Sequence, residues 1–216
     1  MQIEALNLPG GNVKASAMWD GALRIVQSHG RYADAVARGS VFSVADIAGQ
    51  TIPSGLSTAP ATTTLWNPPG SGVFCSVLYG NVFQTIIWAA VAAVWVGVGA
   101  PSQTSPLNTA ATMATNSVGG RGLAGSRVVA LTPGTGAILL PTAPTIIADL
   151  GAALRGAVTT LPYATGLGRW FDGLIGIPPG GTLSFQASAV GPTSGSWGCW
   201  IWEEVPMSGA GTSLTA

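Results

Sequence analysis

Short apolar runs, separated by Gly, Pro, Ser and Thr, recur along this chain of 216 residues. The clearest runs cover residues 40–47, 61–66, 73–79, 82–98, 125–131, 173–177, 182–189 and 197–205. Alternation of apolar and polar positions, β-branched side chains and Gly or Pro boundaries are typical of β-strands. We therefore expect an all-β fold of about eight to ten short strands, an antiparallel β-sandwich or jelly roll.

Two similar turn-and-strand units stand out within this pattern. Pro68-Pro69-Gly70 precedes the run at 73–79, and Pro178-Pro179-Gly180 precedes the run at 182–187. Proline fixes φ and glycine adopts positive φ readily, so each unit predicts a tight turn that leads into a strand. Gly80-Asn81 is a further candidate turn, which would separate the runs 73–79 and 82–98.

Other segments have a weaker pattern. Residues 21–38 fit a short helix or a first strand equally well, and residues 146–158 fit a short helix, so we expect at most two short helices. Residues 101–122 and 163–172 are expected to be loops. The resulting organisation is an N-terminal arm or first element (residues 1–38), a sandwich domain (39–206) and a flexible C-terminal tail (207–216).

No charged residue occurs between Ile47 and Gly120, and residues 82–100 are almost entirely apolar. This stretch is long enough for a transmembrane helix, which needs about 20 apolar residues. It lacks flanking Lys or Arg, is rich in Val and Ile, and divides into two strand-length pieces. Two buried strands are the favoured interpretation, and a membrane span of residues 82–100 is the minor alternative.

Charged residues make up only 7% of the chain and the formal net charge is zero, whereas ordinary globular domains contain about 25% charged residues. Either Ser and Thr cover the surface, or much of it is buried against copies or partners; we favour the second explanation. The arginines are scattered, so no nucleic-acid-binding surface is expected. The N-terminal residues lack the pattern of a signal peptide.

Residues suited to catalysis or metal binding are sparse. His29 is the single histidine, and we expect it to be a solvated loop residue. Cys75 and Cys199 are expected to be buried free thiols, although a disulfide stays open. Glu203 and Glu204 are the only adjacent acids; in a strand they face opposite sides, so we expect one to pair with an arginine and the other to meet solvent. We expect no enzyme activity, no metal site and no cofactor.

The eight tryptophans are the remaining candidates for function. They fill a core and a subunit interface, or they form a platform on which sugar rings stack, with Trp170 and Trp202 as the residues to test. Trp200 and Trp202 are spaced to share one face of a strand. As candidate interaction residues we take Trp88, Trp95, Trp170, Trp202 and Arg121, the last at the end of the charge-free loop 101–122.

The motifs at residues 65–72, 174–181 and 202–206 (Trp202-Glu203-Glu204-Val205-Pro206) lie within a β-rich region of about residues 38–206. This region resembles the jelly-roll surface proteins of tailed bacteriophage virions, including capsid decoration (cement) proteins. The resemblance implies a homotrimer on the capsid surface, made in the host cytoplasm, which binds the major capsid protein or other virion proteins. It carries over no catalytic residue. The alternative is a receptor-binding or fibre-tip jelly roll that recognises cell-surface glycans.

Overall fold

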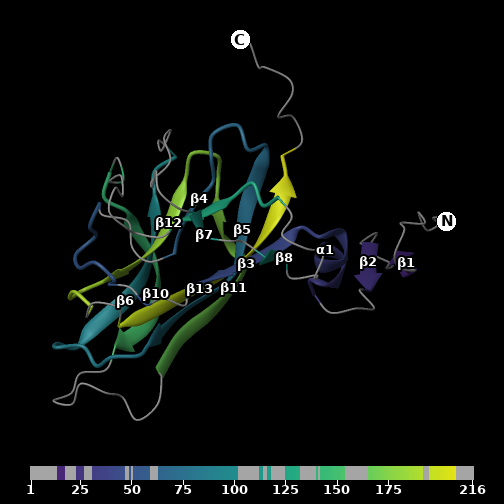
Figure 1. Ribbon diagram of the computed structural model, residues 1–216. Coiled ribbons are helices and arrows are strands. Elements are labelled where there is room, and N and C mark those ends of the chain that lie inside the picture. The colour runs from purple at the N-terminus through teal and green to yellow at the C-terminus, as the bar shows by residue number, and fades with distance from the viewer. Residues whose placement is uncertain are drawn as a thin grey trace.

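The computed structural model describes residues 14–17, 23–26, 31–46, 49, 51–58, 63–101, 112–113, 116–117, 125–131, 140, 142–153, 165–191 and 195–207. Within these ranges the chain forms thirteen strands and one helix (Figure 1). The elements are β1 (Lys14–Ala17), β2 (Leu23–Val26), α1 (Ala33–Arg38), β3 (Val41–Ala45), β4 (Thr64–Trp66), β5 (Val73–Gln84), β6 (Ala92–Gly99), β7 (Thr112–Met113), β8 (Asn116–Ser117), β9 (Val129–Leu131), β10 (Thr145–Ala153), β11 (Thr165–Ile177), β12 (Thr182–Ala187) and β13 (Ser196–Pro206).

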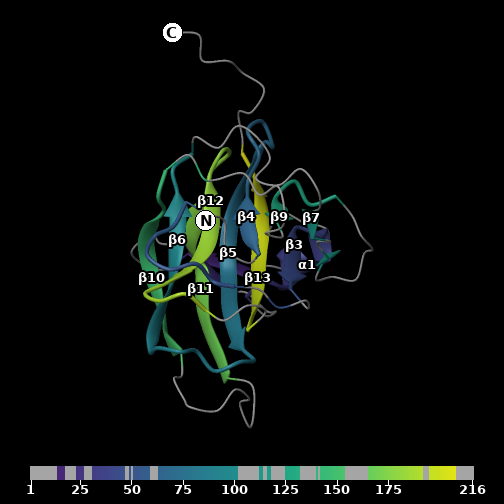
Figure 2. The same cartoon turned by 60° about the vertical axis from the view of Figure 1, so that its left-hand side comes forward.

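Two antiparallel sheets pack face to face as a sandwich (Figures 1 and 2). One sheet has the order β10-β6-β12-β4-β9-β7 and the other has the order β11-β5-β13-β3-β8, while β1 and β2 pair separately. Strands β11, β12 and β13 each lie in the opposite sheet from the strand before them. The antiparallel sandwich expected from the sequence is confirmed.

The core lies between the two sheets. Inward positions of β5, β6, β12 and β13 alternate with outward ones, as the pleat of a strand requires. The inward positions supply Val77, Val94, Leu183, Trp200 and Trp202, all of which are fully buried. Trp200 and Trp202 therefore share one face of β13, as their spacing predicted. Burying such side chains stabilises the fold by about 1.5–3 kcal/mol each.

Asn67 joins the two Pro-Pro-Gly turns at one end of the sandwich. Its side-chain Nδ2 donates hydrogen bonds to the carbonyls of Val73 and Ile177, both at 2.9 Å. Its backbone N–H donates to Gly181 O, and its carbonyl accepts from Gly180 N. The two units that look alike in the sequence are thus neighbours in space, and one buried amide fixes the start of β5 and the end of β11.

The turn predicted at Gly80-Asn81 is wrong, because β5 continues through both residues to Gln84. Gly80 lies beneath the Trp200 ring, and a Cβ at this position would collide with that ring. The glycine therefore reflects a close approach in the core and not a reversal of the chain.

The helix predicted at residues 146–158 and the loop predicted at residues 163–172 are also wrong, because β10 and β11 occupy these segments. Residues 145–153 form an edge strand where a helix was expected, and Gly151, with a φ of +128°, is outside the helical region. Residues 165–177 form one long strand where residues 163–172 were expected to be a loop. In both segments, glycines hid the strand pattern although they fit the sheet.

The helix and the predicted loop at 101–122 show smaller differences. Residues 21–38 contain both a strand and a helix: β2 and α1, which ends at Gly39 in the left-handed conformation. The two-residue strands β7 and β8 fall within the predicted loop, most of which lies outside the described residues. Residues 208–216 of the predicted tail also lie outside them, so the limits of the arm and tail stay predictions.

Among the described residues, the two long outer strands of the sandwich, β10 and β11, are interrupted. The ladder of β10 shifts register between Ile146 and Ala148 and again between Asp149 and Gly151, and that of β11 shifts between Trp170 and Ile175. The outermost described strands at the other edges are β7 and β8, with two described residues each. Arg169 of β11 donates a hydrogen bond from a guanidinium nitrogen to the carbonyl of Asp149 in β10 (3.1 Å), which connects the two edges on that side.

Candidate interaction surface

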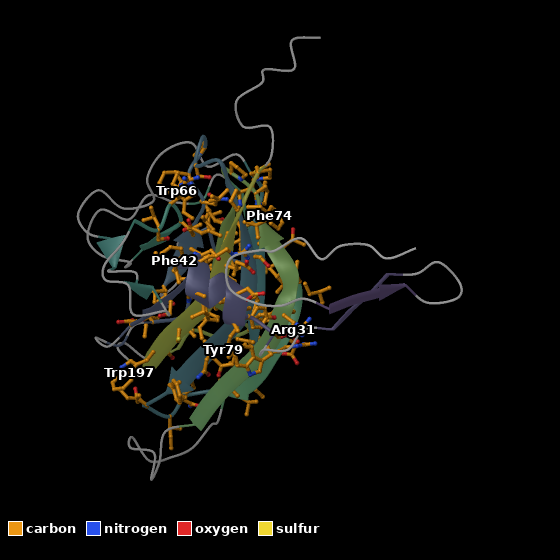
Figure 3. All side chains as sticks on the ribbon, turned by 90° about the vertical axis from the view of Figure 1, so that its right-hand side faces the viewer. Arg31, Phe42, Trp66, Phe74, Tyr79 and Trp197 are labelled. Carbon is orange, nitrogen blue, oxygen red and sulfur yellow. The ribbon has the colours of Figure 1, made fainter. Side chains whose placement is uncertain are left out.

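The outer face of the five-stranded sheet carries a concentration of exposed apolar side chains. Phe83 of β5 and Trp197 of β13 are paired across the ladder, and both are about 40% exposed (40% and 41%). The outward positions of β5, β11 and β13 add Phe74, Trp170, Leu174 and Val205. Figure 3 views the molecule from the side on which α1 lies, and Phe74, Tyr79, Trp197 and Arg31 are labelled there. We call these six apolar residues, together with Tyr79, the aromatic face.

The aromatic side chains of β5 lie across glycines of the edge strand β11. A Cβ added to Gly176 would collide with the Phe74 ring, and one added to Gly168 would collide with the Tyr79 hydroxyl. At Gly166 an added Cβ would lie 3.1 Å from the Phe83 ring. Aromatic rings that cover glycines of a neighbouring strand compensate for the missing side chains. The rings are therefore held close to the sheet.

Trp170 is the most exposed aromatic residue of this surface, at 59%. It is paired with Tyr79 in the ladder, and the two ring centroids are 4.8 Å apart with the planes tilted by 44°. A tilted pair at this distance is a favourable aromatic geometry. One side of the Trp170 ring is thus supported by the protein while most of its area faces solvent.

The bulge in β11 holds a small polar cluster at the border of the aromatic face. Asp172 has a φ of +53° and Gly173 a φ of +82°, which displaces this part of the strand from the regular ladder. The Asp172 carboxylate accepts a hydrogen bond from the Tyr32 hydroxyl at 2.9 Å and pairs with Arg31 at 2.8 Å. Burial, and then the hydrogen bond to Asp172, raise the pKa of Tyr32 above its ordinary value of 10.0.

Helix α1 covers another part of the same sheet face. Ala35 of the helix is buried against Val41 of β3 and Leu78 of β5, with Val36 and Ile201 at the margin of this cluster. At the far end of the helix, Arg38 lies 3.8 Å from Glu203. Two ion pairs, Arg31 with Asp172 and Arg38 with Glu203, therefore lie at the edge of the aromatic face.

Glu203 and Glu204 face opposite sides of β13, as neighbouring residues of a strand do. Only Glu203 has the role predicted for it. Glu203 faces outward and pairs with Arg38, as expected for one of the two. Glu204 is buried, not solvated: its Oε1 accepts hydrogen bonds from Ser126 Oγ (2.7 Å) and the backbone N–H groups of Arg127 (2.8 Å) and Val128 (3.1 Å). The carboxylate thus fixes the segment that leads into β9.

The sequence-predicted interaction residues separate into three groups. Trp88 and Trp202 are 1% and 0% exposed, so their assignment to an interaction surface is wrong, because a buried ring reaches no partner. Trp95 is half-buried on β6, between Gln186 and Asp149 of the neighbouring strands. Trp170 belongs to the aromatic face, and Arg121 lies outside the described residues.

Sequence reasoning missed several members of the aromatic face. Phe74, Tyr79, Phe83 and Leu174 are not among the predicted interaction residues, which are four tryptophans and one arginine. The alternation within residues 73–79 places Phe74 outside if Val73 and Cys75 are inside, so this signal was available for Phe74. No comparable signal existed for Leu174, since its exposure depends on the bulge.

Both cysteines are free, and Cys75 is buried while Cys199 is half-buried. Burial raises the pKa of the Cys75 thiol well above its ordinary value, and the nearby Glu204 carboxylate raises it further. Burial also raises the pKa of Cys199. The expectation of unpaired thiols is confirmed, although only Cys75 lies deep in the core.

The described residues contain neither a metal-binding cluster nor a membrane-spanning helix. No group of three or more His, Cys, Asp or Glu side chains within them is arranged to hold a metal ion. Among the same residues, no helix has the length and apolar character needed to span a membrane; the apolar stretch 82–100 contributes to β5 and β6.

Comparisons of the chain with protein-family models, with curated proteins and with solved structures find no match.

Proposed function

We propose that the protein is a structural protein of a bacteriophage virion, in particular a homotrimeric capsid decoration protein that binds the major capsid protein lattice. The observation that supports this most is the aromatic face: exposed aromatic and aliphatic side chains gather on one sheet surface, with paired charges at the border. Surfaces of this kind mark sites of protein association. The motifs at residues 65–72, 174–181 and 202–206 resemble those of jelly-roll virion proteins, and this resemblance is the reason for proposing a virion as the site of assembly.

The sandwich suits such a role physically. Asn67 and Glu204 tie loops to strand ends at one end of the molecule, so the loops are carried on a fixed scaffold. A protein that binds only the mature arrangement of a coat lattice stabilises that arrangement by mass action. Such a clamp needs a rigid body and an association surface.

The test is whether the protein forms part of virus particles from its source. An antiserum against the purified protein should label intact particles at capsid positions in electron micrographs. Particles from which the protein has been removed should release DNA at a lower temperature, and adding it back should restore the original value. Particles that lack the protein, with all of it left in the soluble fraction, would contradict the proposal.

A second candidate function, recognition of cell-surface glycans, is favoured by one observation: the exposed Trp170 ring supported by Tyr79. A flat, solvent-facing aromatic ring suits the apolar side of a sugar. Binding on a glycan array that disappears in Trp170→Ala but persists in Trp95→Ala would support this function. An array without any bound glycan would remove it.

A further inference from the structure

Eleven large apolar side chains are exposed among the described residues. Six of them belong to the outer face of β5, β11 and β13: Phe74, Phe83, Trp170, Leu174, Trp197 and Val205. The most exposed is Leu174, at 87%, beside the displaced residues Asp172 and Gly173. The bulge therefore presents an aliphatic side chain almost entirely to solvent, next to a row of rings.

The rings on this face are already ordered. Phe74, Tyr79 and Phe83 lie against glycines of β11 and not upright in solvent, and Trp170 is held by Tyr79. Binding is weakened when side chains must be immobilised on association. Because these rings already lie against the sheet, a partner would bind them at a smaller entropic cost than side chains that extend freely into solvent.

The charges around the face narrow the choice of partner. Arg31 pairs with Asp172 and Arg38 pairs with Glu203, so the border carries no net charge from these four groups. A partner rich in Lys or Glu would lose hydration of its charges without finding opposite ones. A second copy of this chain has only 7% charged residues and zero net charge. Its binding would therefore bury few charges that lack an opposite partner, and the two copies would not repel each other.

We infer that the aromatic face packs against a second copy of the chain and is buried between subunits of the assembly. The inference deepens the proposed function and rests on it for the number of copies: in a trimer, the aromatic faces of three subunits would meet around the threefold axis. It names the association surface: β5, β11 and β13, with Leu174 and Trp170 as contact residues.

Multi-angle light scattering on the size-fractionated, detergent-free protein tests this. The wild-type protein should have the mass of an oligomer, and Leu174→Asp should reduce it to that of one chain, because a charge would be buried at the contact. Val190→Asp is the matched control: Val190 is 58% exposed and follows β12 of the other sheet, and this variant should keep the oligomer mass. Both positions are solvent-exposed, so neither change should disturb folding.

Acrylamide quenching of tryptophan fluorescence gives an independent readout. Trp170 and Trp197 should be protected in the wild-type oligomer and become accessible in Leu174→Asp. A wild-type protein that is a monomer at the highest soluble concentration would overturn the inference, as would a Leu174→Asp variant with unchanged mass and quenching.

The two proposals fail in different ways. If Leu174→Asp reduces the measured mass to that of one chain, but the protein never occurs in virus particles, the subunit contact is supported and the virion role is contradicted. If the protein binds virus particles as a monomer, the subunit contact is contradicted and the virion role is supported.

Discussion

The rings of Phe185 in β12 and Trp200 in β13 stack in parallel across the core, with centroids 4.1 Å apart and planes 4° apart. They come from opposite sheets, so this one contact joins the two layers. The Trp200 Nε1 also donates a hydrogen bond to the carbonyl of Thr63 at 2.8 Å. Trp200 therefore holds the sandwich together by both dispersion and a buried hydrogen bond.

Trp200→Ala should lower the free energy of unfolding by about 3–5 kcal/mol, the usual cost of removing a large buried ring. Urea unfolding followed by circular dichroism measures the loss. The control is Trp170→Ala, an exposed position where we expect about 0.5 kcal/mol. Both should be made in the Leu174→Asp background, because self-association would add stability. Equal losses in the two variants would contradict the central role of Trp200.

Gly80 and Gly176 provide a matched pair of glycines that face aromatic rings. Gly80→Ala should cost about 1–3 kcal/mol, because the buried Trp200 ring has no room to move aside. Gly176→Ala should cost clearly less, since the Phe74 ring is partly exposed and turns away from the added methyl group. The comparison is made by thermal and urea unfolding. A larger loss at Gly176 than at Gly80 would show that the rings of the aromatic face are fixed as firmly as the core.

Neighbouring glutamates on β13 should respond differently to loss of charge. Glu204→Gln weakens hydrogen bonds from three donors to a buried carboxylate, and we expect a loss of about 1.5–3 kcal/mol. Glu203→Gln breaks only an ion pair with the exposed Arg38, where a loss below about 1 kcal/mol is expected. Hydrogen exchange of the Arg127 and Val128 amides should accelerate in Glu204→Gln alone. Unchanged exchange in that variant would argue against the proposed anchoring.

Stability should fall at alkaline pH because of Cys75. Its pKa is raised in the folded protein by burial and by Glu204, so the unfolded chain loses the thiol proton at a lower pH than the folded one. The stabilising effect is complete below the unfolded pKa, about 8.5, and is lost as pH rises toward the folded value. Unfolding free energies measured on both sides of this range should decline more steeply in the wild type than in Cys75→Ala. Parallel declines would refute the assignment to Cys75.

The sequence predicted the sandwich because alternation and Gly or Pro boundaries are local features. It placed β3, β4, β12 and β13 close to their observed limits. The errors at Gly80, at 146–158 and at 163–172 share one cause. In each segment a glycine serves close approach to a neighbouring strand or a positive φ, and neither property is visible without knowledge of that neighbour.

The exposure of individual side chains was harder to predict than the fold. Trp170 is exposed, whereas Trp88 and Trp202 have the same chemistry and are buried. Residue type alone does not tell the two faces of a strand apart when both carry aromatic side chains. The exposure of Leu174 depends on a register shift within β11, and the buried role of Glu204 depends on donors more than 70 residues earlier in the chain, as the separation of 76 from Val128 shows.

The interrupted edges of the sandwich affect how copies of the protein meet at high concentration. A long, regular outer strand would invite the strand of another molecule, and such addition continues without limit into fibres. Here the ladders of β10 and β11 are interrupted by register shifts, and irregular edges of this kind are poor templates for the strand of another molecule. We therefore expect contacts between molecules to be made by side chains and not by pairing of these edge strands.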